Sequence, residues 1–488
     1  MVRSKAGGGA GRPSVGELIE DIGAGRAQLI ILLTGGVVLF NRGIQMCLMS
    51  ILTIPVANTF KLGPNSEGLL STLMFVGMFC GTIASGYLGD RLGRRIPVCT
   101  SALTVSLIGA LSALAQNYHA LLVLRFVLGF FMAFGDVPVT ALLSEVTPQR
   151  WRIPIRAASE GFFDIGYTYA AFLATLNDPY LHNLEWRRLL LMASIPPGVI
   201  GILTIFVLPE SPVYLASTGD HVRAQRILTS MKRMNGMPGI SVDYEPPLQD
   251  SASVPAMEQL RIIFGTRYLR VTIILAYTTF IINFFYYGGM YTQPQVMQKG
   301  HGLLPGWEIV LGGPADIFGI LVATAIAQLL PRKVVLSFAM LMAAVGISCF
   351  GYAGSMEQRS WFLELVYHFG VLGFYWVPAM TFIVLGQLSV ETFPTVASAT
   401  GGSVAFSAGR LGALAAPMVF ENIRAQTGRW NLFCYIAAIG CLLGMLLVIF
   451  VWAPPEEDDD PYESAPDRIL PLADAEEGKK RHMLAKQS

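Results

Sequence analysis

The sequence predicts an all-α membrane protein with twelve transmembrane helices in two six-helix bundles. Three observations lead to this prediction. Only 14% of the 488 residues are charged and 53% are hydrophobic, whereas a soluble domain carries about 25% charged residues. Twelve apolar runs approach the length of about 20 residues that a helix needs to cross a bilayer core. One long polar connection, residues 210–270, leaves six runs on either side.

The expected spans follow one another closely, apart from the long connection in the middle. We assign residues 27–209 to a first six-helix half and residues 271–453 to a second. In chain order the spans lie near residues 27–50, 67–89, 97–116, 120–143, 155–177, 188–209, 271–293, 309–330, 334–354, 361–387, 396–420 and 430–453.

Both ends of the chain are expected to be disordered. Residues 1–26 contain the glycine-rich stretch "AGGGAGRPS", and residues 454–488 form an acidic tail that begins "PPEEDDDPYESAPD". Such compositions offer too little apolar surface to compensate for the entropy lost on ordering.

The connection 210–270 is predicted to be a cytosolic linker with short amphipathic helices. The stretch "TGDHVRAQRILTSMKRM" begins with helix-initiating polar residues and places apolar residues at helical spacing. The stretch "PAMEQLRIIFGTRYLR" predicts a second such helix, which leads into the seventh span. A separate catalytic module in this connection is the less favoured alternative.

The distribution of positive charge predicts the orientation. If both termini lie inside, the tails and the even-numbered connections hold most of the 34 lysines and arginines, as the positive-inside rule requires. Both termini are therefore expected in the cytosol. The sequence leaves open whether the membrane is the plasma membrane or that of an organelle.

The sequence offers no pattern typical of an enzyme. The six cysteines fall in apolar runs, and neither they nor the six histidines have metal-ligand spacing. We find no nucleophile–base pair and no nucleotide-binding loop. We therefore expect no metal, no cofactor, no nucleic-acid partner and no catalysis, and we expect a monomer in the lipid bilayer.

The most specific motif is "GYLGDRLGRR", from Gly86 to Arg95, in the turn after the second span. It combines a glycine that permits close helix approach with Asp90 and three arginines in a tight turn. The pattern resembles the signature of the major facilitator superfamily, whose fold is two pseudo-symmetric six-helix bundles. The resemblance implies that the turn acts as a latch between the two halves, through ion pairs across helix ends.

Three further stretches resemble the same family, so that the resemblance covers nearly the whole chain. They are "SEVTPQRWR" after the fourth span, "LPESPVYLASTGDHVRAQRIL" after the sixth, and "SVETFPT" after the tenth. Val213 and Ser398 stand where the family has arginine, and the second-half counterpart of the turn is reduced to "IAQLLPRKVV". The implied gating residues are Gly86, Asp90, Arg91, Gly93, Arg94, Arg95, Glu145, Arg152, Glu210 and Glu391.

Within the superfamily, the chain resembles the organic-ion, synaptic-vesicle-protein-2-like and bacterial niacin-permease group. The similar stretches are "FIINFFYYGGMY" in span seven, "FGDVPV" in span four, "EGFFDIG" in span five and "ADIFG" in span eight. The resemblance implies a secondary transporter of a small organic solute that works by alternating access. Proton-coupled relatives carry acids in span one, but this chain has no Asp or Glu between Ile22 and Ser66.

Ionisable residues inside the spans are candidates for function, because a charge in the bilayer is costly. Arg42 and Arg410 are expected to form a cationic centre that favours a carboxylate-bearing substrate. Glu160 and Asp164 lie one helical turn apart and are the candidates for proton coupling, although Arg156 could simply pair with Glu160. The expected substrate-binding residues are Arg42, Gln45, Asp136, Asn283, Tyr286, Tyr287, Asp316, Trp376 and Arg410.

Our preferred interpretation is a transporter of an organic anion or monocarboxylate of the niacin type, with symport, uniport and antiport left open. A carrier of organic cations, which would use Asp136, Glu160 and Asp316, is the alternative within the same class. A non-transporting membrane scaffold or nutrient sensor is the alternative from a different class.

Overall fold

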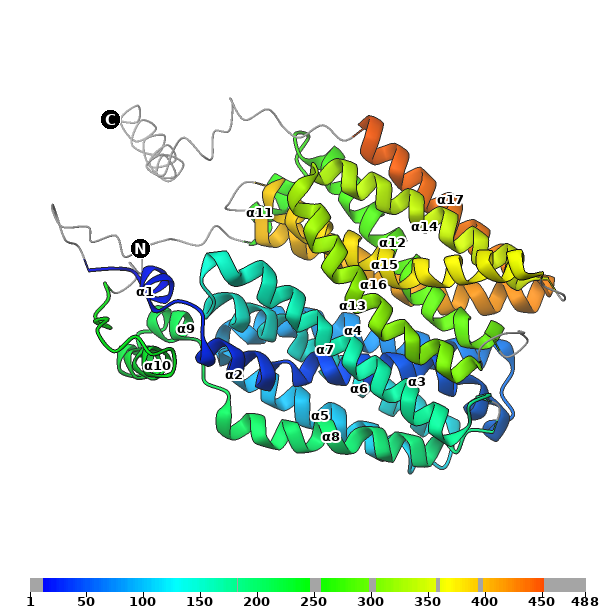
Figure 1. Cartoon of the computed structure of the whole chain (residues 1–488), viewed down its shortest axis with the longest axis horizontal. Helices are drawn as coiled ribbons and strands as arrows, with labels where there is room; N and C mark the ends of the chain where they lie inside the picture. Colours follow the sequence, from blue (N-terminus) through cyan, green and yellow to red (C-terminus); the bar gives the residue numbers. More distant parts are fainter. Residues whose placement is uncertain are drawn as a thin grey trace, which may run out of the picture.

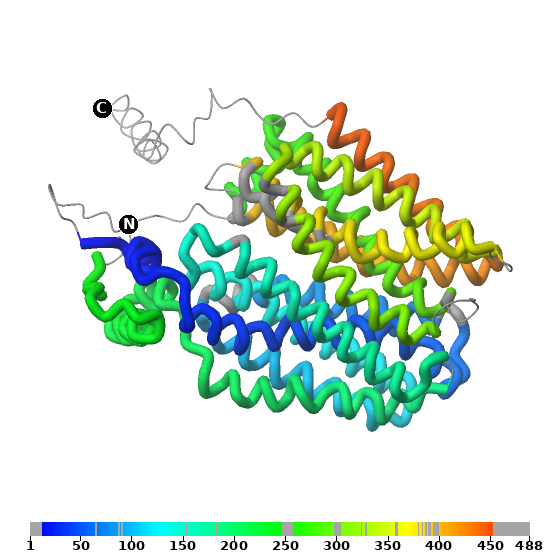
Figure 2. The backbone as a smooth tube through the Cα atoms, viewed as in Figure 1, coloured from blue at the N-terminus to red at the C-terminus, as the bar shows by residue number. Residues whose placement is uncertain are grey.

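A computed structural model describes residues 12–181, 183–245, 256–297, 304–356, 360–393 and 398–451 of the chain. Throughout these residues the regular secondary structure is helical. Long helices pack into two bundles that lie one above the other in Figures 1 and 2. The prediction of an all-α fold is confirmed, and each expected span falls on a long helix.

The first bundle contains the helices that precede the long connection. Its members are α2 (Arg26–Gly35), α3 (Val37–Phe60), α4 (Pro64–Leu92), α5 (Arg95–Ser112), α6 (Tyr118–Glu145), α7 (Gln149–Asn177) and α8 (Trp186–Val207). Helices α2 and α3 follow one another through Gly36 and together form one apolar span, Arg26–Phe60.

The second bundle contains the helices that follow the connection. Its members are α12 (Leu269–Met297), α13 (Pro305–Leu329), α14 (Arg332–Gly354), α15 (Trp361–Glu391), α16 (Ser398–Thr427) and α17 (Asn431–Leu446), which continues as the π-helical turn η1 (Leu447–Val451). Across both bundles, 11 helices of the described chain are long and apolar enough to cross a membrane. Helix α7 is not among them, because Glu160, Asp164 and further polar residues lower its hydropathy.

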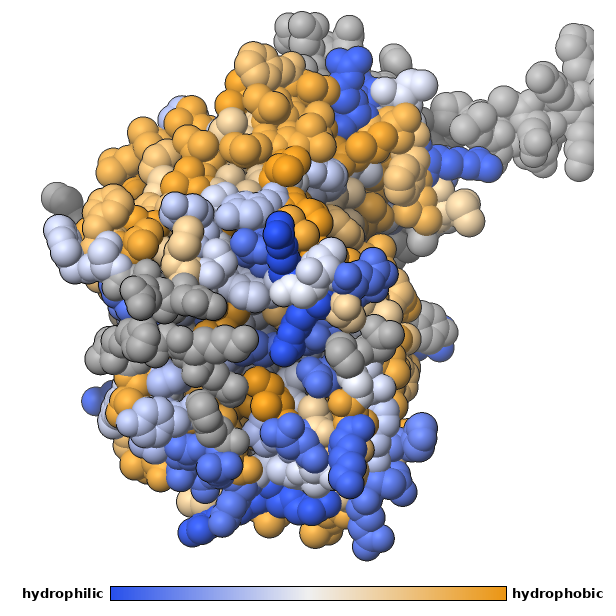
Figure 3. Space-filling model, turned by 90° about the vertical axis from the view of Figure 1, so that its right-hand side faces the viewer, coloured by the Kyte–Doolittle hydropathy of each residue, from blue (hydrophilic) through white to orange (hydrophobic). Residues whose placement is uncertain are grey.

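Side chains on the outside of the bundles are strongly apolar. Phe206 on α8, Leu329 on α13 and Phe450 on η1 are 79%, 81% and 78% exposed. Figure 3 views one end of the molecule, where hydrophilic side chains gather, while hydrophobic surface dominates the sides of the upper bundle. This division fits a protein whose sides contact lipid and whose ends contact water.

Short helices cover one end of the molecule, which we call the linker face; the opposite end is the far face. The short helices are α1 (Val15–Ile22), α9 (Pro212–Ser217), α10 (His221–Met234) and α11 (Ala256–Ile263). All four lie on the left in Figure 1. The last three lie in the connection 210–270, and the exact domain boundaries stay a prediction.

Helix α1 corrects the expectation of disorder at residues 15–22; residues 1–11 of the expected disordered segment lie outside the described residues. Ser14 forms a capping box with Glu17, in which each side chain accepts a hydrogen bond from the other's backbone N–H. The apolar residues Val15, Leu18 and Ile22 are buried in a cluster with residues of α9 and α10. The expected disordered segment extended too far along the chain, because residues 15–22 bury an apolar face against the linker helices. Residues 454–488, the expected acidic tail, lie outside the described residues.

Glycines allow the helices that carry the central charges to approach closely. A Cβ atom on Gly43 of α3 would collide with the Phe163 carbonyl of α7, and one on Gly166 of α7 would collide with the Phe40 carbonyl of α3. In the second half, Gly412 of α16 lies equally close to the Phe280 carbonyl of α12. Small residues at such crossings let helix backbones pack tightly in lipid.

The two halves meet along three pairs of helices, α3 with α12, α4 with α16 and α7 with α13. Near the middle, the rings of Phe75 and Tyr287 pack edge to face with their centroids 5.1 Å apart. At the far face, the Gly306 N–H donates to the Pro179 carbonyl at 3.0 Å. These contacts bring residues from both halves together near the centre of the molecule.

We predict that Gly43→Val destabilises the protein by about 1–3 kcal/mol, because the new side chain must push α3 away from α7. Thermal unfolding of the detergent-solubilised protein measures the effect. Gly198→Ala is the matched control, since its Cβ would meet only the Ser106 Cβ at an ordinary 3.7 Å. A wild-type unfolding temperature for Gly43→Val would contradict the prediction.

Candidate functional site

The centre of the molecule holds an arginine bound by two carboxylates. Arg42 Nη1 on α3 lies 3.0 Å from Asp136 Oδ2 on α6, and Arg42 Nη2 lies 2.8 Å from Glu160 Oε2 on α7. The Arg42 Cζ atom also lies 5.0 Å from the centre of the Phe163 ring. Charge-assisted hydrogen bonds and a cation–π contact thus stabilise the guanidinium inside the bundle.

Arg410 brings a second guanidinium to the same carboxylate from the other half. Its Nη2 lies 3.6 Å from Asp136 Oδ2, and this is its one ion pair among the described residues. The Arg410 side chain is 18% exposed and that of Glu160 is 34% exposed, so the cluster is open on one side. Arg410 therefore keeps donors that can turn to a bound solute.

The expected cationic centre is not what the structure shows. Two arginines, Arg42 and Arg410, face two carboxylates, Asp136 and Glu160, so their charges compensate one another. Compensation of this kind is the arrangement that buried charges require. The Arg156 Nε lies 3.5 Å from Glu160 Oε1, so the alternative ion pair considered for these residues is present.

Asp164 has a different partner from Glu160, although the two acids are one turn apart on α7. The Asp164 carboxyl lies within hydrogen-bonding reach of the carboxyl of Asp316 on α13. Asp164 is 2% exposed and Asp316 is 7% exposed. Asp316 was expected to contact the substrate. In the structure it lies beside Asp164, at the interface between the two halves.

Three of the expected substrate residues lie on the inner face of α12. The Tyr286 and Tyr287 rings pack with centroids 5.0 Å apart, and both tyrosines are close enough to Arg42 to interact electrostatically. The Asn283 Nδ2 donates to the Thr279 carbonyl at 2.8 Å and packs against Gly409, the neighbour of Arg410. The structure thus brings these three side chains close to the central charges.

Two expected site residues point elsewhere. Gln45 is 1% exposed and its Oε1 accepts a hydrogen bond from Arg125 Nη1 at 3.4 Å, which turns it toward α6 and away from the cluster. Trp376 is 42% exposed and packs against the exposed Phe318, at 6.0 Å between ring centres. It belongs to an exposed apolar stripe of α15 at helical spacing, which faces lipid: Leu365, Phe369, Leu372 and Trp376.

The turn between α4 and α5 is held by two glutamates, one at the end of α6 and one at the start of the connection 210–270. Glu210 Oε1 accepts the N–H of Arg94 at 2.8 Å, and Glu210 Oε2 accepts the N–H of Arg95 at 3.2 Å. Glu145 Oε1, at the end of α6, lies 3.2 Å from Arg94 Nη2. Gly93 has a φ angle of +83°, which suits glycine. A carboxylate at the start of α5 also complements the helix dipole.

The remaining latch residues are only partly placed. The Arg91 carbonyl accepts from the Tyr214 hydroxyl at 2.9 Å, and the Arg152 Nε donates to the Thr147 carbonyl at 3.3 Å. The Arg91 contact joins the turn to the connection 210–270, and the Arg152 contact lies within the first half. The side chains of Gly86, Asp90 and Glu391 lie outside the described ones.

A second polar cluster, at the far face, was absent from the sequence-based expectations. Tyr291 Oη donates to Glu421 Oε1 at 2.8 Å, and Arg424 Nη1 donates to Gln295 Oε1 at 2.9 Å. The same Arg424 atom lies 3.6 Å from Glu421 Oε2 and 3.9 Å from Glu67 Oε2. Because Glu67 belongs to α4 and the others to the second half, the cluster joins the halves at this end.

The sequence contains one signal that could have pointed to this cluster. Glu421 lies one residue beyond the expected span 396–420, and Arg424 follows it at ion-pair spacing. The structure extends α16 to Thr427 and buries Glu421 to 1% exposure. Its partners on α4 and α12 could not be found from the sequence, because they depend on how the two halves pack.

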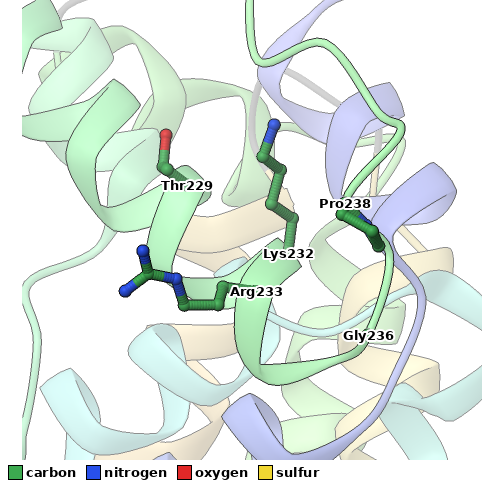
Figure 4. A pocket seen from close by; sticks show the side chains of 5 residues that line it. All are labelled: Thr229, Lys232, Arg233, Gly236 and Pro238. Carbon is green, nitrogen blue, oxygen red and sulfur yellow. The ribbon is translucent and has the colours of Figure 1, made fainter.

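A surface pocket of about 430 Å³ lies away from this chemistry, at the end of α10. Figure 4 shows Thr229, Lys232, Arg233, Gly236 and Pro238 around it. The Lys232 Nζ donates to the Ile240 carbonyl at 2.7 Å, so it holds the linker in place. No group of three His, Cys, Asp or Glu side chains with the geometry of a metal site occurs among the described residues.

Comparisons with known proteins place this geometry in a family. The profile of the family described as "Sugar (and other) transporter" matches residues 56–456. The niacin transporter NiaP of Acinetobacter baylyi is 26% identical over 441 residues, which cover 88% of this chain and 95% of that protein. The organic cation/carnitine transporter 7 of Arabidopsis thaliana is 25% identical over 455 residues, covering 84% and 88% of the two chains.

Solved structures show the same fold. The inward-open xylose transporter XylE from E. coli superposes with a TM-score of 0.68 at 17% sequence identity. The superposition covers 88% of this chain and 97% of that one. The expected major facilitator fold is thereby confirmed.

We predict that Glu210→Gln lowers the stability by about 1 kcal/mol, because it removes the charge that caps the start of α5. Thermal unfolding in detergent measures the loss. Glu185→Gln is the control, since its 66% exposed side chain makes only a surface pair with Arg188 and should change the stability by less than about 0.5 kcal/mol. Equal effects of the two substitutions would show that Glu210 has no special role.

Proposed function

The chain belongs to the sugar (and other) transporter family, and on that premise we propose that it carries a small organic anion, a monocarboxylate of the niacin type. As a member of this family it is a transporter and not an enzyme. The observation that supports the anion most directly is the pair of arginines, one from each half, that meet at Asp136. The relationship to a niacin transporter at 26% identity points to the same class of solute.

The substrate carboxylate would bind Arg410 first. That guanidinium has a single, loose ion pair with Asp136, so an incoming carboxylate can accept two of its N–H groups side by side. Arg42 is held by two hydrogen-bonded carboxylates and would act mainly by keeping Asp136 in place. Asn283, beside Gly409, offers a polar contact next to Arg410.

Aromatic side chains around the charges suit a planar ring on the substrate. Phe163 on α7 packs against the Arg42 guanidinium, and Tyr286 and Tyr287 on α12 lie near enough to interact with it electrostatically. Ligand sites in proteins combine such apolar walls with a few convergent polar groups. Tyr287 also touches Phe75 of the other half, so a ring bound here would contact both halves.

Transport would proceed by alternating access, in which the two halves rock about the central site. The halves touch through α3–α12, α4–α16 and α7–α13. The Glu67–Arg424 contact would close the far face, and the α4–α5 turn would control the linker face. A substrate that touches Arg410 and the aromatic groups of the first half would favour closure around itself.

We place the linker face in the cytosol, with both termini on that side, since most lysines and arginines of the connections lie there. The protein would act as a monomer in the plasma membrane or an organelle membrane. Of the two candidates for proton coupling, Asp164 fits better than Glu160, because Glu160 already pairs with Arg42 and Arg156.

Arg410→Ala is expected to reduce uptake of radiolabelled nicotinate into proteoliposomes at least about tenfold, which corresponds to the loss of a charge-assisted contact of about 1.4 kcal/mol or more. Arg410→Lys should retain part of the activity, because it keeps the charge without the planar fork. Arg429→Ala, at an exposed arginine in the connection between α16 and α17, is the control. Full uptake by Arg410→Ala would rule out the anion site.

The alternative of an organic-cation carrier has a specific observation in its favour, the three acids Asp136, Glu160 and Asp316 near the centre. The name of the Arabidopsis relative points the same way. We expect benzoate to compete with nicotinate uptake and tetraethylammonium not to compete, since Arg410 offers N–H donors that a carboxylate can accept and a quaternary ammonium cannot. Competition by tetraethylammonium alone would favour the cation carrier. Absence of flux for any acid or amine would favour a scaffold or sensor.

A further inference from the structure

The carboxyl groups of Asp164 and Asp316 form an acid pair across the interface of the two halves. Asp164 lies near the middle of α7 and Asp316 near the middle of α13, and the two carboxyls lie within hydrogen-bonding reach of each other. An ionised carboxylate has acceptors only, so two of them cannot form a hydrogen bond unless one carries a proton. A hydrogen bond between these two carboxyls therefore requires a proton on one of them.

The pair is enclosed and lacks a cation of its own. Asp164 and Asp316 are 2% and 7% exposed, and the ion pairs of the described residues include none with either side chain. The Asp164 Oδ2 atom has no hydrogen-bond partner among the described residues. Such a buried, unpartnered oxygen is a place where a further proton can bind.

The backbones of α7 and α13 come together around the pair. A Cβ atom on Gly313 of α13 would collide with the Thr168 hydroxyl and approach the Asp164 carbonyl of α7. The other charged or titratable groups that face the pair come from α3, α7, α12 and α15. They are Arg42, Glu160, Tyr286 and Tyr375.

We propose that the Asp164–Asp316 pair is a proton-binding site that takes up one proton with each substrate anion and releases it on the other side of the membrane. A proton from water forms an O–H bond with the unpartnered Asp164 oxygen, so the pair changes from one shared proton to two. In the reverse step this O–H bond breaks and the proton returns to water. The proposal rests on the proposed function in one respect, the negative charge of the substrate.

Charge balance explains why one proton would accompany one anion. Arg42, Arg410 and Arg156 pair with Asp136 and Glu160, and these pairs exist before the substrate binds. A monocarboxylate adds one negative charge when it binds. The second proton on the acid pair cancels that charge, so the total charge of the carrier is unchanged. The carrier therefore has the same net charge with and without substrate when it changes between its outward-open and inward-open conformations.

The state of the pair also affects how the halves pack. With no proton, two negative charges would face each other across α7 and α13 and repel strongly in a medium of low dielectric constant. With one or two protons, the carboxyls can hold the helices together. Proton binding would thus favour closure of the interface between α7 and α13, on which transport depends.

The test compares wild type with the double variant Asp164→Asn/Asp316→Asn in proteoliposomes that take up nicotinate. The rate of wild-type uptake should increase under an inward-directed proton gradient and should not change when a potassium diffusion potential is applied. In the double variant, the ratio of gradient-driven accumulation to nicotinate counterflow should fall about tenfold, and uptake should become sensitive to the potential. Asp243→Asn, an exposed acid of the linker, is the control and should behave as wild type.

A second measurement needs no substrate. Infrared difference spectra of the purified protein between about pH 8 and about pH 5 should contain the carbonyl band of a protonated carboxylic acid. The band should change in the single variants Asp164→Asn and Asp316→Asn, whose amide can still donate to the remaining carboxylate and preserve the fold. It should be unchanged in Asp243→Asn.

The outcomes separate the two proposals. If the single variants keep the band and the double variant keeps gradient-driven accumulation, the acid pair is not the proton site, although the protein still transports the anion. If wild type carries no nicotinate but the single variants alter the band, the proton site stands and the anion assignment fails. If neither the band nor the flux is found in wild type, both are overturned.

Discussion

A buried charge in a membrane-spanning bundle must be compensated by other groups of the protein, and this constraint organises the structure. Arg42 lies in a helix that is otherwise almost wholly apolar, and leaving it unpaired there would be prohibitive. Asp136 and Glu160 come from two other helices to bind it, at 3.0 and 2.8 Å. Three helices of the first half are thereby tied together at one point.

This ion-pair cluster depends on close packing of the backbones. Gly43 and Gly166 let α3 and α7 touch, which brings the Arg42 guanidinium within reach of Glu160. Asp136 then extends the cluster to the second half, because Arg410 of α16 approaches the same carboxylate. The acid pair Asp164–Asp316 makes a further polar link between the halves, one turn along α7 from Glu160. Packing and charge compensation are thus two aspects of the same arrangement.

The arrangement also explains how the molecule could be both stable and able to move. Within the first half, the guanidinium of Arg42 makes two short charge-assisted bonds, and Glu210 of the connection caps α5. The ion pairs between the halves are longer: Arg410 lies 3.6 Å from Asp136, and Arg424 lies 3.9 Å from Glu67. Ion pairs that are longer at the interface than within the first half suit two rigid bodies that rock against each other.

The sequence by itself determined the features that follow from composition: an all-α membrane fold and the position of each span. It also identified the charged residues inside the spans as candidates for function, because placing a charge in the bilayer costs free energy. Helical periodicity could also have shown that Trp376 lies on an exposed apolar stripe. Only the tertiary structure decided which charges meet. Residues Arg42 and Glu160 are 118 positions apart in the chain, and no local pattern encodes their contact. Instead of the expected cationic centre, the structure contains arginines paired with carboxylates. It also shows that Gln45 faces Arg125 and that Asp316 lies beside Asp164. The physical reason is that the cost of burying a charge is a property of one residue, whereas its compensation depends on the packing of several helices.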